Sequence, residues 1–171
     1  MSPRSRRGGE GRRAEPLEQD AYDAAVVYLA NRPRSVAEIQ RHLKRKKFDD
    51  PAIERAIDKL RAQRYVDDDA FAKYWLEQRA RFRQKGDRAL RSELLAKGVA
   101  RDAIDGALGE REPDAELEQA RVALRRPLTR WLTLDEGERK RKAHAYLVAR
   151  GFSYDTIESV LLHLGEDDER G

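Results

Sequence analysis

One short helical pattern recurs three times in this 171-residue chain, and it constrains the fold more than any other feature. The turn of the pattern falls at Lys47, Gly98 and Gly151. Glycine is the residue that most easily takes the left-handed conformation that often ends a helix. The segments around the turn align without gaps, as expected of tandem structural repeats. The corresponding apolar positions are Ile39/Leu90/Ala143, Leu43/Leu94/Leu147, Phe48/Val99/Phe152, Ile53/Ile104/Ile157 and Ile57/Leu108/Leu161.

The first copy opens with an apolar segment that has helical periodicity. Ala24, Val27 and Tyr28 recur at helical spacing, and we expect them to form the buried side of a helix. Val26 and Leu29 widen this apolar stripe. The segment therefore predicts a helix that packs on the rest of its copy.

Two further helices of the first copy begin at capping signals. Ser35 with Glu38 three residues later forms a capping box, in which each side chain binds a free backbone N–H of the other residue. Asp49 precedes Pro51, and this pair also suits a helix start, because Asp accepts from the first-turn N–H groups and proline needs no donor there. The first copy is thus expected to be a three-helix unit.

Similar signals mark the helices of the second and third copies. Three consecutive acids, Asp67-Asp68-Asp69, complement the positive end of a helix dipole. A Gly86-Asp87 break separates the first two helices of the second copy. The third copy opens near Asp114, and Pro127 predicts that residues 127–133 form a linker, because proline disfavours a helix interior.

The end of this linker contains a second capping signal. Thr133 with Glu136 predicts a capping box at the second helix of the third copy. Trp131 and Leu132 are the large apolar residues of the linker, and we expect both to pack against a neighbouring helix.

Together these signals predict an all-α protein of three tandem three-helix repeats that resemble helix-turn-helix units. The repeats are expected at residues 18–66, 67–113 and 114–165. Residues 1–17 are rich in Arg, Gly, Ser and Pro, and we expect a disordered basic tail, because few apolar side chains offset the entropy of ordering. Residues 166–171 are expected to form an acidic C-terminal tail.

Basic residues gather in the second helix of the first copy and around the Gly86 break of the second. Lys and Arg in such segments can track phosphate groups, which makes binding strongly salt-dependent. A solvated helix face explains the same pattern, and charge alone does not separate the two. The candidate nucleic-acid or filament-binding residues are Arg41, Lys44, Arg45, Lys46, Lys47, Arg79, Arg81, Arg83, Lys85, Arg88 and Arg91.

The sequence lacks the usual marks of an enzyme or a membrane protein. It contains no cysteine, which excludes disulfides, thiol catalysis and Cys-type zinc sites. His42, His144 and His163 lie far apart in the chain without carboxylates at ligand spacing, so we expect no metal and no cofactor. No apolar run approaches the roughly 20 residues that span a bilayer. We expect a non-enzymatic, cytoplasmic monomer.

Three segments of the chain resemble the RecX family, in the same order as in that family. They are Tyr65 to Ala72 at the first junction, Lys85 to Val99, and Arg150 to Leu161. Asp87 departs from the pattern, because the family often has proline or another turn residue there. We expect Asp87 to serve equally well as a helix cap. The basic N-terminal tail lies outside the resemblance.

The resemblance implies an elongated, curved array of three three-helix repeats that binds the filament of the RecA recombinase. It further implies a regulator, usually an inhibitor, of the ATPase, strand-exchange and coprotease activities of RecA in DNA repair and the SOS response. Weak, non-specific binding to single- and double-stranded DNA is also implied. Two alternatives stay open: a helix-turn-helix-like DNA-binding protein that acts without RecA, and a helical scaffold for another protein.

Overall fold

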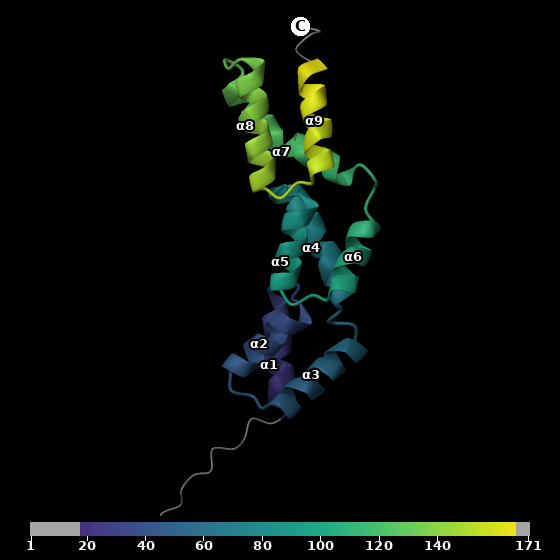
Figure 1. Cartoon of the computed structure of the whole chain (residues 1–171). Helices are drawn as coiled ribbons and strands as arrows, with labels where there is room; N and C mark the ends of the chain where they lie inside the picture. The colour runs from purple at the N-terminus through teal and green to yellow at the C-terminus, as the bar shows by residue number, and fades with distance from the viewer. Residues whose placement is uncertain (1–17, 167–171) are drawn as a thin grey trace, which may run out of the picture.

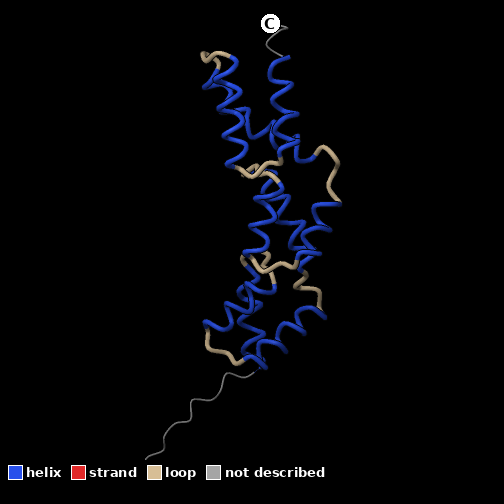
Figure 2. The backbone as a smooth tube through the Cα atoms, viewed as in Figure 1, coloured by secondary structure: helices blue, strands red, loops and turns tan. Residues whose placement is uncertain are grey.

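Nine α-helices make up residues 18–166, the part of the chain that this computed structural model describes (Figure 1). Within these residues the backbone consists of helices and loops without strands, which confirms the predicted all-α class (Figure 2). The expected tails lie outside the described residues, except for Glu166, which ends the last helix. The helices are α1 (Glu18–Ala30), α2 (Val36–Arg45), α3 (Asp50–Ala62), α4 (Asp68–Phe82), α5 (Asp87–Ala96), α6 (Arg101–Gly109), α7 (Ala115–Trp131), α8 (Glu136–Ala149) and α9 (Tyr154–Glu166).

The helices form three tandem repeats that are stacked end to end, so the molecule is elongated (Figure 1). Repeat 1 contains α1 to α3, repeat 2 contains α4 to α6, and repeat 3 contains α7 to α9. The helices that pack most extensively on one another belong to the same repeat, with α1 on α3, α4 on α6, and α7 and α8 on α9. Each repeat therefore has its own apolar core and meets only its neighbours.

The positions that correspond in the sequence lie at the centres of these cores. Leu43, Leu94 and Leu147 are completely buried, and each leucine contributes roughly 1.5–3 kcal/mol to stability through burial. The isoleucines that follow the turn are buried as well. They are Ile53, Ile104 and Ile157. The periodicity therefore identified the helix faces around each turn correctly.

The turn itself has the same left-handed backbone in all three repeats. The φ angle is +68° at Lys47, +78° at Gly98 and +77° at Gly151. Repeats 2 and 3 use glycine at this position for a second reason. A Cβ atom on Gly98 would lie 2.4 Å from the Cβ of Ala37, and one on Gly151 would lie 2.5 Å from the Cβ of Ala89. Among residues 18–166 no other repeat packs against the turn of repeat 1, so lysine is tolerated there.

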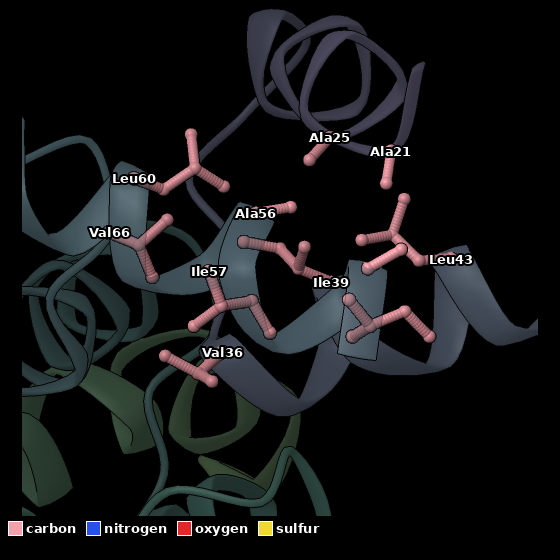
Figure 3. Packing of buried hydrophobic residues seen from close by; sticks show 11 residues of the cluster. Ala21, Ala25, Val36, Ile39, Leu43, Ala56, Ile57, Leu60 and Val66 are labelled. Atoms are coloured by element: carbon pink, nitrogen blue, oxygen red, sulfur yellow. The ribbon is translucent and has the colours of Figure 1, made fainter. Parts of the chain in front are cut away.

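The core of repeat 1 corrects the predicted buried face of α1 (Figure 3). Ala21 and Ala25 face α3 and are completely buried, whereas Val27 is 69% exposed and Ala24 is only partly buried. Of the predicted stripe, Tyr28 does pack on the core. The prediction followed the larger side chains, but small residues allow α1 to approach α3 closely, and this close packing decided the face.

Residues 127–133 are not the predicted linker, because α7 continues through Pro127 to Trp131. Leu128 and Trp131 pack against the core of repeat 3, and their burial offsets the backbone hydrogen bond that the proline removes. Leu132 is 67% exposed, so the prediction that it packs against a neighbour is wrong.

Most of the predicted helix caps are present, but those of α5 and α8 differ from the prediction. The Ser35 capping box forms as predicted, and Asp49 accepts from a first-turn N–H of α3. At α8, however, the N-cap is Asp135 rather than Thr133, and its carboxylate accepts from the N–H of Glu138 at 2.8 Å. The predicted Thr133 capping box is therefore wrong, because a carboxylate two residues later holds the N-cap position.

Adjacent repeats meet where the second helix of one repeat begins on the turn of the next. At the first junction the Ser35 hydroxyl donates to the carbonyl of Lys97 at 2.6 Å. At the second junction the N–H of Gly86 donates to the carbonyl of Arg150 at 3.0 Å. Gly86 has no room for a side chain, because a Cβ atom there would lie 2.1 Å from the Cα of Phe152.

A carboxylate from the following repeat completes each junction. The N–H of Val36, the first residue of α2, donates to Asp68 at 2.9 Å. The N–H of Asp87, the first residue of α5, donates in the same way to Glu116 at 2.8 Å. Asp87 is thus not the cap that the sequence predicts: Gly86 holds the N-cap position, and the Asp87 carboxylate binds Arg111.

Candidate nucleic-acid interface

The predicted basic residues fall into two groups in the structure. One group is already bound to carboxylates or backbone carbonyls of the described residues. The side chains of the other group make no hydrogen bond or ion pair with the described residues and are exposed. The second group consists of Arg45, Lys46, Lys47, Arg81 and Arg83.

The free cations of repeat 1 lie at the C-terminal end of α2. Arg45 ends the helix, and Lys46 and Lys47 form the turn after it. Their positive field reaches His42: burial lowers the pKa of this imidazole, and Lys46 and Arg45 lower it further. His42 also stacks on Tyr28, with ring centres 3.9 Å apart. This end of α2 is therefore a positively charged surface around a histidine whose pKa is lowered.

Two other predicted residues of α2 have partners. Lys44 lies 3.3 Å from Asp50, but both side chains are largely exposed, and such pairs stabilise proteins little. Arg41 donates to the carbonyl of Ala37 at 3.2 Å and reaches across the junction to the carbonyl of Ala96 at 3.5 Å. Arg41 therefore helps to join repeats 1 and 2.

Arg79 and Lys85 are occupied within repeat 2. Both bind Glu93, Arg79 at 2.8 Å. Trp75 donates its indole N–H to the same carboxylate at 2.9 Å, and its ring lies under the Arg79 guanidinium. Burial raises the pKa of Glu93, but hydrogen bonds from Lys85, Arg79 and Trp75 outweigh this effect and lower it. These cations stabilise the fold of the repeat.

Arg88 and Arg91 also have partners. Arg88 donates to the carbonyl of Val148 in repeat 3 at 3.4 Å, and Arg91 pairs with Asp105. Arg81 and Arg83 remain free at the end of α4, on either side of Phe82 along the chain. Phe82 is 73% exposed, so this end of α4 presents an aromatic ring together with two unpaired guanidinium groups.

The sequence patterns missed an ion pair that joins repeats 1 and 2. Lys97 lies 3.0 Å from Glu38, and these side chains are only 17% and 11% exposed. Burial raises the pKa of Glu38, but the N–H of Ser35 and the ammonium of Lys97 outweigh it and lower the pKa. No local signal marks such a pair, because the two residues belong to different repeats.

The structure also places a hollow of about 530 Å³ at the junction of repeats 2 and 3. Its wall includes Arg150, whose guanidinium lies 3.8 Å from the ring centre of Tyr146. Neither residue was predicted as a binding residue, although the repeat alignment places Arg150 opposite Lys97. The lining residues are Phe82, Arg83, Gln84, Lys85, Ala89, Tyr146, Ala149 and Arg150.

Neither a metal site nor a membrane-spanning helix is found in the part of the chain that the structure covers. Among residues 18–166, no cluster of three or more His, Asp or Glu side chains could hold a metal ion. No helix within the same range is long and apolar enough to cross a membrane. The basic surfaces and the hollow are thus the candidate features for function.

Comparison with protein families places all three repeats in one family. The RecX first, second and third three-helix domains match residues 21–60, 67–108 and 114–161, respectively. The chain is 36% identical over 141 residues to Regulatory protein RecX of Prosthecochloris aestuarii, covering 82% of this chain and 91% of that protein. It is 31% identical over 174 residues to Regulatory protein RecX of Mycobacterium sp. (strain JLS), covering 98% and 95%.

Other relatives are longer than this chain. Regulatory protein RecX of Halalkalibacterium halodurans is 33% identical over 140 residues, and the chain spans only 53% of its length. Among solved structures, RecX from Lactobacillus salivarius shares the fold with a TM-score of 0.79 at 22% identity, covering 86% of this chain and 96% of that one. A second structure, of regulatory protein RecX, gives a TM-score of 0.74 at 27% identity, covering 83% and 71%.

Proposed function

The chain belongs to the RecX family, and from this premise we propose that it regulates the RecA recombinase by binding the RecA–DNA filament. The observation that carries the proposal is the match of three RecX domains in order along the chain. The relatives are named as regulatory proteins, so the proposed role is regulation rather than catalysis. The protein would act in the cytoplasm as a monomer, without a cofactor.

The architecture is suited to a long polymeric partner. The three repeats form an elongated array, and such an array can contact several subunits of a filament at once (Figure 1). The free cations at the ends of α2 and α4 would attract phosphate groups and acidic protein surfaces, which raises the association rate. We propose that these cations contact the filament or its DNA. They are Arg45, Lys46, Lys47, Arg81 and Arg83.

An ATPase titration tests the proposal directly. RecA is assembled on single-stranded DNA, and the rate of ATP hydrolysis is followed as the protein is added. We expect hydrolysis to fall, with parallel losses of strand exchange and coprotease activity. An unchanged rate at stoichiometric excess would overturn the proposed inhibition, and a raised rate would make the protein an activator.

The free cations also favour a second candidate, a DNA-binding protein that acts without RecA. Binding of labelled single- and double-stranded DNA, measured by fluorescence anisotropy over a range of salt concentrations, separates the two. The filament proposal predicts that RecA-coated DNA is bound more tightly than bare DNA. Steeply salt-dependent binding to bare DNA, without any gain on the filament, would favour the second candidate.

A further inference from the structure

The two junctions between repeats contain a basic residue at the same position, but only the one at the first junction pairs with a carboxylate. Lys97 and Arg150 hold the same position in repeats 2 and 3, one residue before the turn glycine. At the first junction Glu38 neutralises Lys97. At the second junction the position of Glu38 is held by Ala89, so Arg150 has no carboxylate opposite it at the place where Glu38 meets Lys97.

A second carboxylate is replaced in the same way. Glu93, which binds Arg79 and Lys85 in repeat 2, corresponds to Tyr146 in repeat 3. Tyr146 cannot neutralise a cation, but its ring face holds the guanidinium of Arg150 in place. Arg150 makes no ion pair with any described residue. The replacement of both carboxylates thus leaves a positioned cation without a counter-charge.

This uncompensated charge lines the hollow between repeats 2 and 3. The wall contains Arg83, Lys85 and Arg150 but no carboxylate residue, and only Lys85 is paired, with Glu93. Phe82 also lines the hollow and leaves most of its ring in water, although burying it would be favourable. The hollow therefore combines unpaired guanidinium groups with an open aromatic face.

We propose that this hollow binds single-stranded nucleic acid. An unpaired base would stack on Phe82, and the adjoining phosphate groups would be held by Arg83 and Arg150. Stacking on an aromatic side chain beside a positively charged groove is the usual way in which single strands are bound. The guanidinium fork matches two phosphate oxygens. An acidic protein segment would satisfy the cations but has no planar base to cover Phe82.

The inference deepens the proposed function, because the bound strand would be the DNA on which the RecA filament assembles. It adds Phe82, Tyr146 and Arg150 to the candidate binding residues that the sequence predicts. The hollow would nevertheless bind a bare single strand, so it can be tested without RecA.

The test measures binding of a fluorescein-labelled oligothymidylate to the full chain by anisotropy. Phe82→Ala should weaken binding roughly tenfold without changing the salt dependence, because a base can no longer stack on the ring. Phe82→Tyr should restore binding. Arg83→Gln and Arg150→Gln should each lower the log–log salt slope by about 0.7 for every phosphate group that the variant no longer neutralises.

A matched control variant separates binding in the hollow from general attraction between the protein's positive charge and the strand. Arg126 is exposed on α7, does not line the hollow and forms no side-chain ion pair with described residues. Arg126→Gln should change binding far less than Arg83→Gln. Phe82 is exposed, so its replacement leaves the core intact, and thermal melting followed by circular dichroism should confirm this for each variant.

Three outcomes would overturn the proposal. Full binding by Phe82→Ala would exclude stacking, and equal losses of affinity in Arg83→Gln and Arg126→Gln would reduce the effect to net charge. Competition by polyglutamate as strong as by unlabelled oligothymidylate would assign the hollow to an acidic protein segment. If strand binding depends on Phe82 but the natural protein does not change the ATPase rate of RecA, the binding site is supported and the proposed regulation is excluded. If Phe82→Ala inhibits RecA as strongly as the natural protein does and still binds the strand fully, the proposed regulation is supported and the proposed binding site is excluded.

Discussion

Gly98 of repeat 2 faces Ala37 of repeat 1 so closely that a Cβ atom on the glycine would lie 2.4 Å from the Cβ of Ala37. The backbone of Gly98 also has a φ of +78°, which side-chain-bearing residues rarely adopt. The junction thus places two demands on one residue, a left-handed turn and a close approach to the preceding repeat. Gly151 meets the same two demands at the second junction.

Gly98→Ala should therefore lower the free energy of unfolding by about 2 kcal/mol, because the left-handed backbone alone costs an alanine roughly 1–2 kcal/mol. The clash with Ala37 adds to this cost. Urea denaturation measures the change. Gly106→Ala is the matched control: nothing lies within 4 Å of its Cβ position in α6, so the protein should gain about 0.5–1 kcal/mol. Equal stability of Gly98→Ala and the natural protein would show that repeats 1 and 2 can move apart at this junction without any loss of folding free energy.

Lys97→Met should destabilise the protein by about 2–3 kcal/mol, because it removes the less exposed of the two cations that bind the largely buried carboxylate of Glu38 and leaves only Arg32, at 3.4 Å. Adding Glu38→Gln should recover part of the loss. A double-mutant cycle in urea measures the coupling between the two residues. Strictly additive effects of the two substitutions would show that the ion pair does not contribute to the junction.

Glu116 predicts how stability changes on acidification. Burial raises the pKa of this carboxyl, but hydrogen bonds from Ser153, Thr156 and the N–H of Asp87 outweigh burial and lower the pKa below 4.5. Its folded pKa is thus below its unfolded pKa. The stability that it contributes is complete above the unfolded value and is lost as the pH falls through the folded value.

The measurement is the free energy of unfolding of the natural protein and of Glu116→Gln, from neutral pH to below 4.5. The natural protein should be the more stable at neutral pH by about 1.5–3 kcal/mol, which is typical of hydrogen bonds to charged groups. The gap should close on acidification. A gap that is independent of pH would mean that the charge of Glu116 does not strengthen its hydrogen bonds.

Arg79→Gln and Arg81→Gln should have opposite consequences, although the residues are two positions apart. Arg79 is bound to Glu93, so its loss should reduce stability by about 1 kcal/mol and leave binding to DNA nearly unchanged. Arg81 is free, so its loss should leave stability unchanged and lower the log–log salt slope of DNA binding by about 0.7–0.9 for each phosphate group that it neutralises. Thermal melting and anisotropy measure the two effects. A lower salt slope for Arg79→Gln alone would contradict the assignment of free and occupied cations.

The fold was predictable from the sequence because most of its signals are local. Such signals act within one or two helical turns. Examples are the capping box at Ser35, the turn glycine Gly98 and the buried Leu94 four residues before that glycine. The misjudged segments are those in which packing outweighed local preference. Pro127 lies inside a helix that the core holds together, and α1 turns its alanines inward because close packing favours them.

The candidate interface was predictable only as basic segments of the chain. Arg79 and Arg81 look alike in the sequence, because the residues around each of them do not reveal whether a carboxylate lies beside it in the folded protein. Glu93 is distant in sequence from Arg79, and folding places it against one of the two arginines only.

The three repeats, their turns and their family could be read from the sequence, because they depend on periodicity, caps and matched segments. Which charges are satisfied, and where two repeats meet, depends on how the repeats pack in space. Lys97 and Arg150 hold the same position in their repeats, but one is neutralised by Glu38 and the other faces Ala89. That difference arises from side chains brought together from neighbouring repeats, and Coulomb interaction depends on distance in space rather than along the chain.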